Sequence, residues 1–151
     1  YLAGAEFEGA LGGVPTTLTV EGIDTRIDET PNGFCGPGTA YNNTRHPYTN
    51  FGAVMGAPID SESHALQLRV RHQLDGLDWI WGVGHYTIND ASLANHRLSS
   101  TRVSGPMAHV GFSAQLGAAE VEAVVVYQDF ELDRADSERG LRVGLNVAMS
   151  F

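Results

Sequence analysis

The residues best suited to recognise a ligand gather in one polar segment, residues 27–64. Its aromatic rings could stack on sugar rings, and its amide, guanidinium and carboxylate groups could hydrogen-bond to hydroxyl groups. Loops longer than about 12–15 residues are usually functional or disordered, and the proline and glycine residues of this one indicate ordered turns. The alternative is that the rings pack the segment against the rest of the fold. The candidates for contacts with a saccharide are Tyr41, Asn42, Arg45, Tyr48, Phe51, Asp60 and Glu62.

The other residues that could carry chemistry form no catalytic or metal-binding pattern. None of the six histidines lies at the His-x₃-His or Glu-x-x-His spacing of a metal site. The acidic groups at residues 24–29 and 133–138 lack the glycine-bearing ligand pattern of a calcium loop. No nucleophile motif accompanies a serine, and Cys35 has no second cysteine to pair with. We therefore expect no enzyme activity, no bound metal and no cofactor.

The charge of the chain excludes one broad class of partner. Among 151 residues, 18 acidic side chains outnumber nine basic ones, all of them arginine, for a formal net charge of −9. A nucleic-acid-binding domain would carry a basic footprint, so we expect no nucleic acid partner. The length suits one domain, and there is no run of 18 apolar residues that would predict a transmembrane helix.

The elements that must position the candidate residues are strands, because apolar and polar residues alternate. In residues 65–74, Leu66, Leu68 and Val70 share one face, while the residues between them are polar. A helix would mix these two sets on every side, so the period of two predicts a strand. The same alternation recurs at weaker or equal strength along the chain, and seven strands are predicted. They cover residues 1–11, 16–26, 65–74, 78–89, 106–116, 119–132 and 141–151.

The connections between these strands alternate in length. Short links at residues 12–15, 75–77 and 117–118 take turns with longer links at residues 27–64, 90–105 and 133–138. In outer-membrane barrels the periplasmic turns are short and the extracellular loops are long. A soluble sandwich has no physical reason to sort its loops in this way.

Together these features predict an antiparallel transmembrane β-barrel in the bacterial outer membrane. Most predicted strands reach the 9–11 residues that a tilted membrane strand needs. Bacterial barrels have an even number of strands, eight or more, so residues 1–151 are expected to be the C-terminal portion of a larger barrel. Residues 27–64 then form a long extracellular loop, and the alternate apolar positions contact outer-membrane lipid. The side chains expected to face the lumen are Gln67, Arg69, Arg71 and Gln73.

Two further features agree with a barrel. The last strand ends in Phe151, and a terminal aromatic residue on an amphipathic strand resembles the signal through which the barrel assembly machinery engages outer-membrane proteins. Barrels also carry aromatic residues at both membrane interfaces. On the periplasmic side these would be Trp79, Trp81, Phe112 and Phe151, and on the extracellular side Tyr86, Tyr127 and Phe130.

Two strands and several pieces of the long loop carry a resemblance to a known family. The strands are Tyr1–Phe7 and Val20–Arg26, the second similar to a strand of Glu-Tyr-Thr-Asp-Thr type. The loop pieces are Gly33-Phe34-Cys35, Ala40-Tyr41-Asn42, Tyr48, Phe51-Gly52 and Met55–Ser63. Over roughly residues 1–85, and again in the terminal strand, the chain resembles the capsule assembly protein Wzi family. It departs from that family at residues 50–54, where an arginine-rich Tyr-Arg-Tyr segment is expected.

The resemblance implies a function at the cell surface. It implies a large outer-membrane barrel with extra helices, only part of which is this chain, that binds capsular polysaccharide and helps to attach it, without catalysis. Two alternatives stay open. One is an outer-membrane porin or transport channel with the polar residues of 67–73 lining an aqueous lumen, and the other is a soluble, secreted all-β domain.

Overall fold

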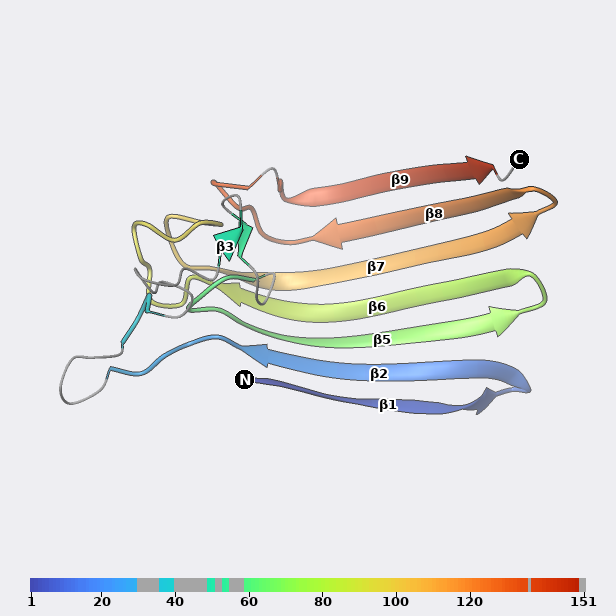
Figure 1. Ribbon diagram of the computed structural model, residues 1–151, viewed down its shortest axis with the longest axis horizontal. Helices are drawn as coiled ribbons and strands as arrows, with labels where there is room; N and C mark the ends of the chain where they lie inside the picture. The colour runs from blue at the N-terminus through green and yellow to red at the C-terminus, as the bar shows by residue number, and fades with distance from the viewer. Residues whose placement is uncertain (30–35, 40–48, 51–52, 55–58, 136, 150–151) are drawn as a thin grey trace.

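The structure is a computed structural model, and it describes residues 1–29, 36–39, 49–50, 53–54, 59–135 and 137–149. Within these residues the chain forms strands and no helix. Seven of the strands make one antiparallel sheet, and all of its long connections lie at the same end (Figure 1). Five of the saccharide-contact candidates, Tyr41, Asn42, Arg45, Tyr48 and Phe51, lie outside the described residues, as does Phe151.

The large sheet is a simple meander in which neighbours in the chain are neighbours in space. Its order is β1-β2-β5-β6-β7-β8-β9, and a separate pair of two-residue strands, β3 (Thr49–Asn50) and β4 (Ala53–Val54), lies within the long connection. The sequence gives no signal for this small pair, which is too short to show a period. The seven long strands are β1 (Leu2–Leu11), β2 (Val14–Asp24), β5 (His64–Leu74), β6 (Leu77–Ile88), β7 (Val103–Leu116), β8 (Ala119–Gln128) and β9 (Gly140–Met149).

Two-residue turns set the register at one end of the sheet. Gly12 and Gly13 both have positive φ, 61° and 85°, as a type I′ hairpin turn requires. The resulting pairs, such as Leu11 with Val14, place side chains of like character opposite one another. The predicted alternation of short turns and long connections is confirmed.

The boundaries of β7 and β8 differ from the prediction. β7 begins at Val103, three residues earlier than expected, and β8 ends at Gln128, four residues earlier. Pro106 explains the early end of β8, because its carbonyl accepts from Asp129 N at 3.0 Å while its ring nitrogen has no hydrogen to donate back. Pairing with β8 therefore stops there, while pairing with β6 continues through Gly105 and Tyr86.

The two faces of the sheet differ in character. Directly paired residues of antiparallel strands point to the same face, so the register defines each face completely. One face, here called the apolar face, includes a row of seven paired residues that crosses the whole sheet without a polar side chain. That row is Phe7, Leu18, Val70, Trp81, Val110, Val125 and Val143.

Much of this apolar face is exposed. Trp79 and Trp81 are 40% and 38% exposed, and Val143 and Leu145 on β9 are each 72% exposed. Soluble domains rarely expose a contiguous apolar surface of this extent. Within the described residues β1 and β9 each pair on one side only, so the sheet is open.

The buried side chains gather at the end of the sheet where the long connections lie. We call this region the loop cluster and define it as the described residues 25–29, 36–39, 59–63, 89–102, 129–135 and 137–139. Its buried residues are mostly polar, with a small apolar group around Ile59, Ala65 and Ile88 beneath them. Among the described residues, no helix is long and apolar enough to span a membrane.

Candidate functional site

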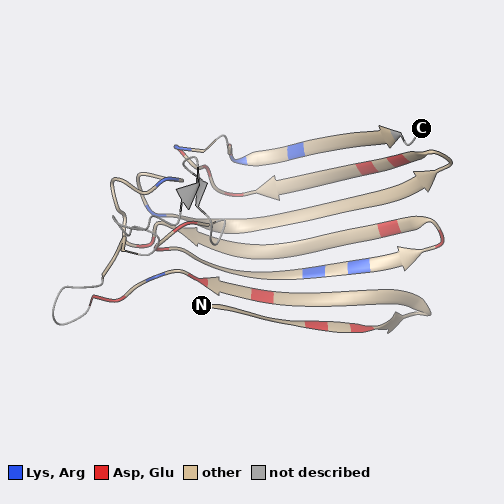
Figure 2. Cartoon of the chain, viewed as in Figure 1, with Lys and Arg blue, Asp and Glu red and all other residues tan. Residues whose placement is uncertain are grey.

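Charged side chains lie on the face opposite the apolar one, which we call the polar face. Figure 2 shows acidic residues on β1, β2, β6 and β8, basic residues on β5 and β9, and neither kind on β7. The four residues predicted to face a lumen share this face on β5, as the alternation required. The polar face also carries charged residues that were not singled out as candidates. They are Glu6, Glu8, Glu21, Asp78, Glu120, Glu122 and Arg142.

The lumen candidates on β5 differ in how they are engaged. Arg71 forms a salt bridge with Asp78 on β6, and Gln67 accepts a hydrogen bond from the Tyr86 hydroxyl at 3.2 Å. Arg69 is exposed and has no hydrogen bond or ion pair within the part of the chain that the structure describes. Its neighbour across the ladder is Gly82, and the His109 ring lies over that glycine, because a Cβ there would be 2.5 Å from His109 Cε1.

The apolar face carries His64, His72 and His85, and both ring nitrogens of His72 are satisfied on that face. The Thr16 hydroxyl donates to Val14 O at 2.9 Å, so its oxygen is free to accept from His72 Nδ1, also at 2.9 Å. His72 Nε2 then accepts from Trp81 Nε1 at 3.4 Å. The relay crosses three strands and leaves no ring nitrogen of His72 in need of water.

The predicted aromatic belts are only partly formed on the apolar face. Trp79 and Phe112 pack with ring centroids 6.1 Å apart near the end with the short turns, and Tyr127 lies on the same face near the other end. Tyr86 instead lies on the polar face, where it contacts the buried Phe130 of the loop cluster at 6.0 Å. The strand period correctly places Tyr127, but Phe130 follows the end of β8 and obeys no strand period.

The loop cluster is organised by Thr25 and Ser63, which follow β2 and precede β5. Thr25 N donates to Ser63 O at 2.8 Å, and the Thr25 hydroxyl donates to Asp60 O at 2.6 Å. Ser63 N donates back to Thr25 Oγ1 at 3.1 Å, and the fully buried Ser63 hydroxyl donates to Ser61 O at 2.9 Å. Buried backbone groups require such partners, so these bonds fix the direction in which the long connection leaves and re-enters the sheet.

Asn89 organises the connection that follows β6. Its side-chain nitrogen donates to Leu93 O and to Ser99 O, both at 3.0 Å, and its side-chain oxygen accepts from Leu93 N at 2.7 Å. Its backbone nitrogen donates to the Ser63 hydroxyl at 3.2 Å. One fully buried side chain therefore closes residues 89–102 on themselves, while the backbone ties them to the segment before β5.

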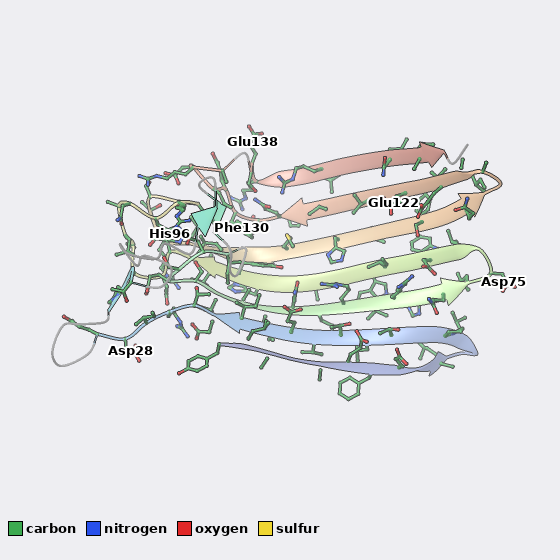
Figure 3. The ribbon with its side chains drawn as sticks, in the orientation of Figure 1. Asp28, Asp75, His96, Glu122, Phe130 and Glu138 are labelled. Atoms are coloured by element: carbon green, nitrogen blue, oxygen red, sulfur yellow. The ribbon has the colours of Figure 1, made fainter. Side chains whose placement is uncertain are left out.

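His96, which lies in the loop cluster (Figure 3), makes a second link between these connections. Its Nδ1 accepts from Leu98 N at 3.2 Å, so the ring hydrogen is on Nε2, which donates to Ser61 O at 2.9 Å. Arg134, from the connection after β8, donates to His96 O at 2.9 Å and to Ala94 O at 2.7 Å. All three long connections are thus joined by hydrogen bonds into one unit.

The two acidic saccharide candidates that the structure describes, Asp60 and Glu62, are buried in this unit. Asp60 is 4% exposed, with its carboxylate 3.8 Å from Arg97 Nε, and Glu62 is 3% exposed and accepts from Gly38 N at 3.0 Å. Their side chains brace the long connection from inside. From the charge pattern alone, acidic loop residues are expected to face solvent. Asp60 and Glu62 instead turn inward because their partners, Arg97 and Gly38, lie far away along the chain.

Backbone strain is concentrated in the same place. Among the described residues, four that are not glycine have a positive φ, and all belong to the loop cluster: Asp60, Glu62, Asn89 and Ser92, with φ between 50° and 62°. Such conformations cost of order 1–3 kcal/mol each and persist where the surroundings over-determine them. The hydrogen bonds of Asn89 and Glu62 hold these residues in their positive-φ conformations.

Ion pairs lie at the edge of the loop cluster, next to the ends of β2 and β6. The Asp90 carboxylate accepts from Arg102 Nε at 2.7 Å and from Arg26 Nη1 at 3.3 Å, and Arg26 also pairs with Asp24 at 2.6 Å. The hydrogen bond from Arg102, supported by Arg26, holds the pKa of Asp90 below its ordinary value. Hydrogen bonds from Ser100 likewise lower the pKa of Asp133.

A small cavity of about 90 Å³ opens within the loop cluster between Asp60, Asn95, His96 and Arg97. Pockets that hold small ligands measure about 300–1,000 Å³, so this one has room for a few water molecules and not for a sugar ring. The described histidines and carboxylates form no group that could hold a metal ion. The residues that carry the loop cluster, Thr25, Ser63, Asn89 and His96, were not predicted, although Asn and Ser directly after strands are a recognisable turn signal.

No protein-family model, curated protein or solved structure matches this chain.

Proposed function

We propose that this chain forms part of the wall of an outer-membrane β-barrel, with its loop cluster at the cell surface. The observation that carries the proposal is the exposed apolar face, which runs across all seven strands opposite a charged face. In water that arrangement leaves a large apolar area uncovered, whereas in a barrel it is the lipid-facing surface and the charged face lines the interior.

The dimensions and chemistry of the sheet support this proposal. Its seven long strands contain 10 to 14 residues, and a tilted membrane strand needs about 9–11. The relay from Trp81 through His72 to Thr16 satisfies a polar ring without water, as a lipid-facing position demands. The unpaired edges of β1 and β9 would pair with further strands, since each unsatisfied backbone group in lipid costs several kcal/mol.

We further propose that the surface end binds capsular polysaccharide, in line with the resemblance to the capsule assembly protein Wzi family. The loop cluster supports this function by joining three long connections into one braced platform, from which residues 40–58 depart and to which they return. Asp60 and Glu62 act in that platform as braces, so the sugar contacts fall to Tyr41, Asn42, Arg45, Tyr48 and Phe51.

A deletion in a capsulated bacterium tests the proposal. Replacing residues 40–58 by a short Gly-Ser linker keeps Gly38 and Asp60 and hence the braces of the loop cluster. The parent protein should remain in the outer-membrane fraction and resist carbonate extraction, while cell-bound capsule falls and released capsule rises. Unchanged capsule retention would overturn the polysaccharide function, and a chain soluble without detergent would overturn the membrane assignment.

A transport channel is the second candidate, and the charges of the polar face favour it. Arg69 is exposed on that face without a partner among the described residues, and acidic side chains lie on the neighbouring strands. Charged lumen residues tune the selectivity of barrel pores. Planar-bilayer recordings of the intact protein distinguish the two, because large steady conductance that changes with Arg69→Gln would favour the channel.

A further inference from the structure

The polar face contains a hollow of about 440 Å³ between β6 and β9 that the proposed surface function does not use. Its position follows from one row of the ladder, in which large and small residues alternate. Ile80 pairs with Gly111, Gly111 with Val124, and Val124 with Gly144. The two glycines leave space where neighbouring rows carry side chains.

The floor of the hollow depends on these glycines. A Cβ at Gly111 would lie 3.1 Å from Ala123 O, and one at Gly144 would lie 3.1 Å from Val124 Cγ1. Both distances are tighter than ordinary contact, so a larger residue would have to displace its neighbours. Ile80 and Val124 stand on either side of Gly111, two strand spacings or about 9.5 Å apart, which admits a flat ring between two aliphatic side chains.

Polar groups complete the rim on the remaining sides. Ser113, Glu122 and Asn146 lie in the next row toward the short turns, and His109 lies in the next row toward the loop cluster. Asn146 Nδ2 donates to Glu122 Oε2 at 3.4 Å, and within the described residues the other carboxylate oxygen of Glu122 accepts no hydrogen bond. Figure 3 shows Glu122 on β8, far from the labelled loop residues His96 and Phe130.

We propose that this hollow is a subsite for one neutral hexopyranose unit of a saccharide. Aliphatic walls suit the C–H faces of a sugar ring, while a carboxylate, an amide, a hydroxyl and an imidazole suit its hydroxyl groups. The charge around the hollow favours a neutral sugar over an acidic one, because Glu122 lines the hollow while Arg71 and Arg142 are engaged with Asp78 and Gln128. The volume lies within the range of small-ligand pockets.

This inference deepens the proposed polysaccharide function and rests on it for the choice of ligand. It adds a second sugar contact, on the polar face of the sheet about midway along the strands, to the one proposed for the surface loop. The two sites can therefore fail independently. Loss of the surface function on deleting residues 40–58 says nothing about the hollow, and a substitution at Glu122 leaves the loop cluster intact.

Calorimetric titration of the intact parent protein in detergent micelles tests the subsite. The probes are maltohexaose, which is neutral, and hexagalacturonate, which is acidic. The test variant is Glu122→Gln, and the matched control is Glu120→Gln, on the same face of β8 but outside the hollow. We expect maltohexaose to bind the unaltered chain and the control equally and to bind Glu122→Gln at least five-fold more weakly.

A second variant tests the subsite by filling its space, because the Glu122→Gln variant alone could weaken binding through the loss of charge. Ser113→Trp places a large ring in the hollow without touching either glycine, and it should abolish maltohexaose binding while the circular dichroism spectrum stays that of a β-sheet. Equal affinity of all variants for maltohexaose, absence of binding to the unaltered chain, or tighter binding of hexagalacturonate than of maltohexaose would overturn the proposal.

Discussion

The sheet and the loop cluster obey opposite rules of burial. In the sheet, apolar side chains such as Val143 and Leu145 are 72% exposed, whereas in the loop cluster polar side chains such as Ser63 and Asn89 are fully buried. Water would favour the reverse in both regions. The contrast teaches that the two regions are stabilised differently: the loops by a closed hydrogen-bond network, and the sheet, on the proposed barrel assignment, by lipid against its apolar face.

The largest effect should come from placing a charge on the apolar face. Leu145→Arg should lower the free energy of unfolding in lipid vesicles by about 2–4 kcal/mol, the cost of an arginine near the bilayer midplane. Asn146→Arg, one residue away on the polar face, should change it little. Urea unfolding of both variants in vesicles measures the difference. If both variants changed the free energy of unfolding by less than about 0.5 kcal/mol, as at an ordinary solvent-exposed position, the assignment of the apolar face to lipid would be contradicted.

A smaller effect is expected from emptying the centre of the loop cluster. Asn89→Ala removes three side-chain hydrogen bonds and leaves the buried Ser99 O and the half-buried Leu93 N without the partners they have in the structure, at a cost of about 1–3 kcal/mol. Hydrogen exchange should quicken at residues 89–102 and stay slow in β5 through β9. Asn95→Ala, an exposed residue of the same connection, is the control, and equal exchange in both variants would contradict the account.

The smallest effect concerns the ion pairs at the rim of the loop cluster. Because Arg102 and Arg26 bind the ionised form of Asp90, its folded-state pKa lies below the ordinary value of 3.8. Its contribution to stability is therefore present above that value and is lost as the pH falls through the lower, folded-state pKa. Hydrogen exchange at the ends of β2 and β6 should quicken over this acidic range, and Asp90→Asn should remove that part of the pH dependence. An identical pH profile in both proteins would argue against this role.

The two regions also differ in how far the sequence predicts them. A strand is a local object, so the period of two in residues 65–74 suffices to place Arg69 and Leu68 on opposite faces. The short links were also located, although those predicted at residues 12–15 and 75–77 are the tighter turns 12–13 and 75–76 in the structure. The boundary of β8 was missed because it depends on Pro106, which lies on another strand.

The loop cluster resists prediction for the same physical reason. The burial of Asp60 and Glu62 depends on Arg97 and Gly38, which lie 37 and 24 residues away along the chain. No local pattern reports contacts of that kind. Asn89 and Ser63 carry a turn signal, yet their part in joining three connections depends on strands that bring β2, β5 and β6 side by side.

Tryptophan fluorescence tests the central claim most directly, because both tryptophans of the chain, Trp79 and Trp81, lie on the apolar face. In vesicles whose lipids carry bromine on their acyl chains, we predict strong quenching of this fluorescence, together with weak quenching by acrylamide added to the water. Strong quenching by acrylamide and none by the brominated lipids would contradict the assignment of this face to lipid.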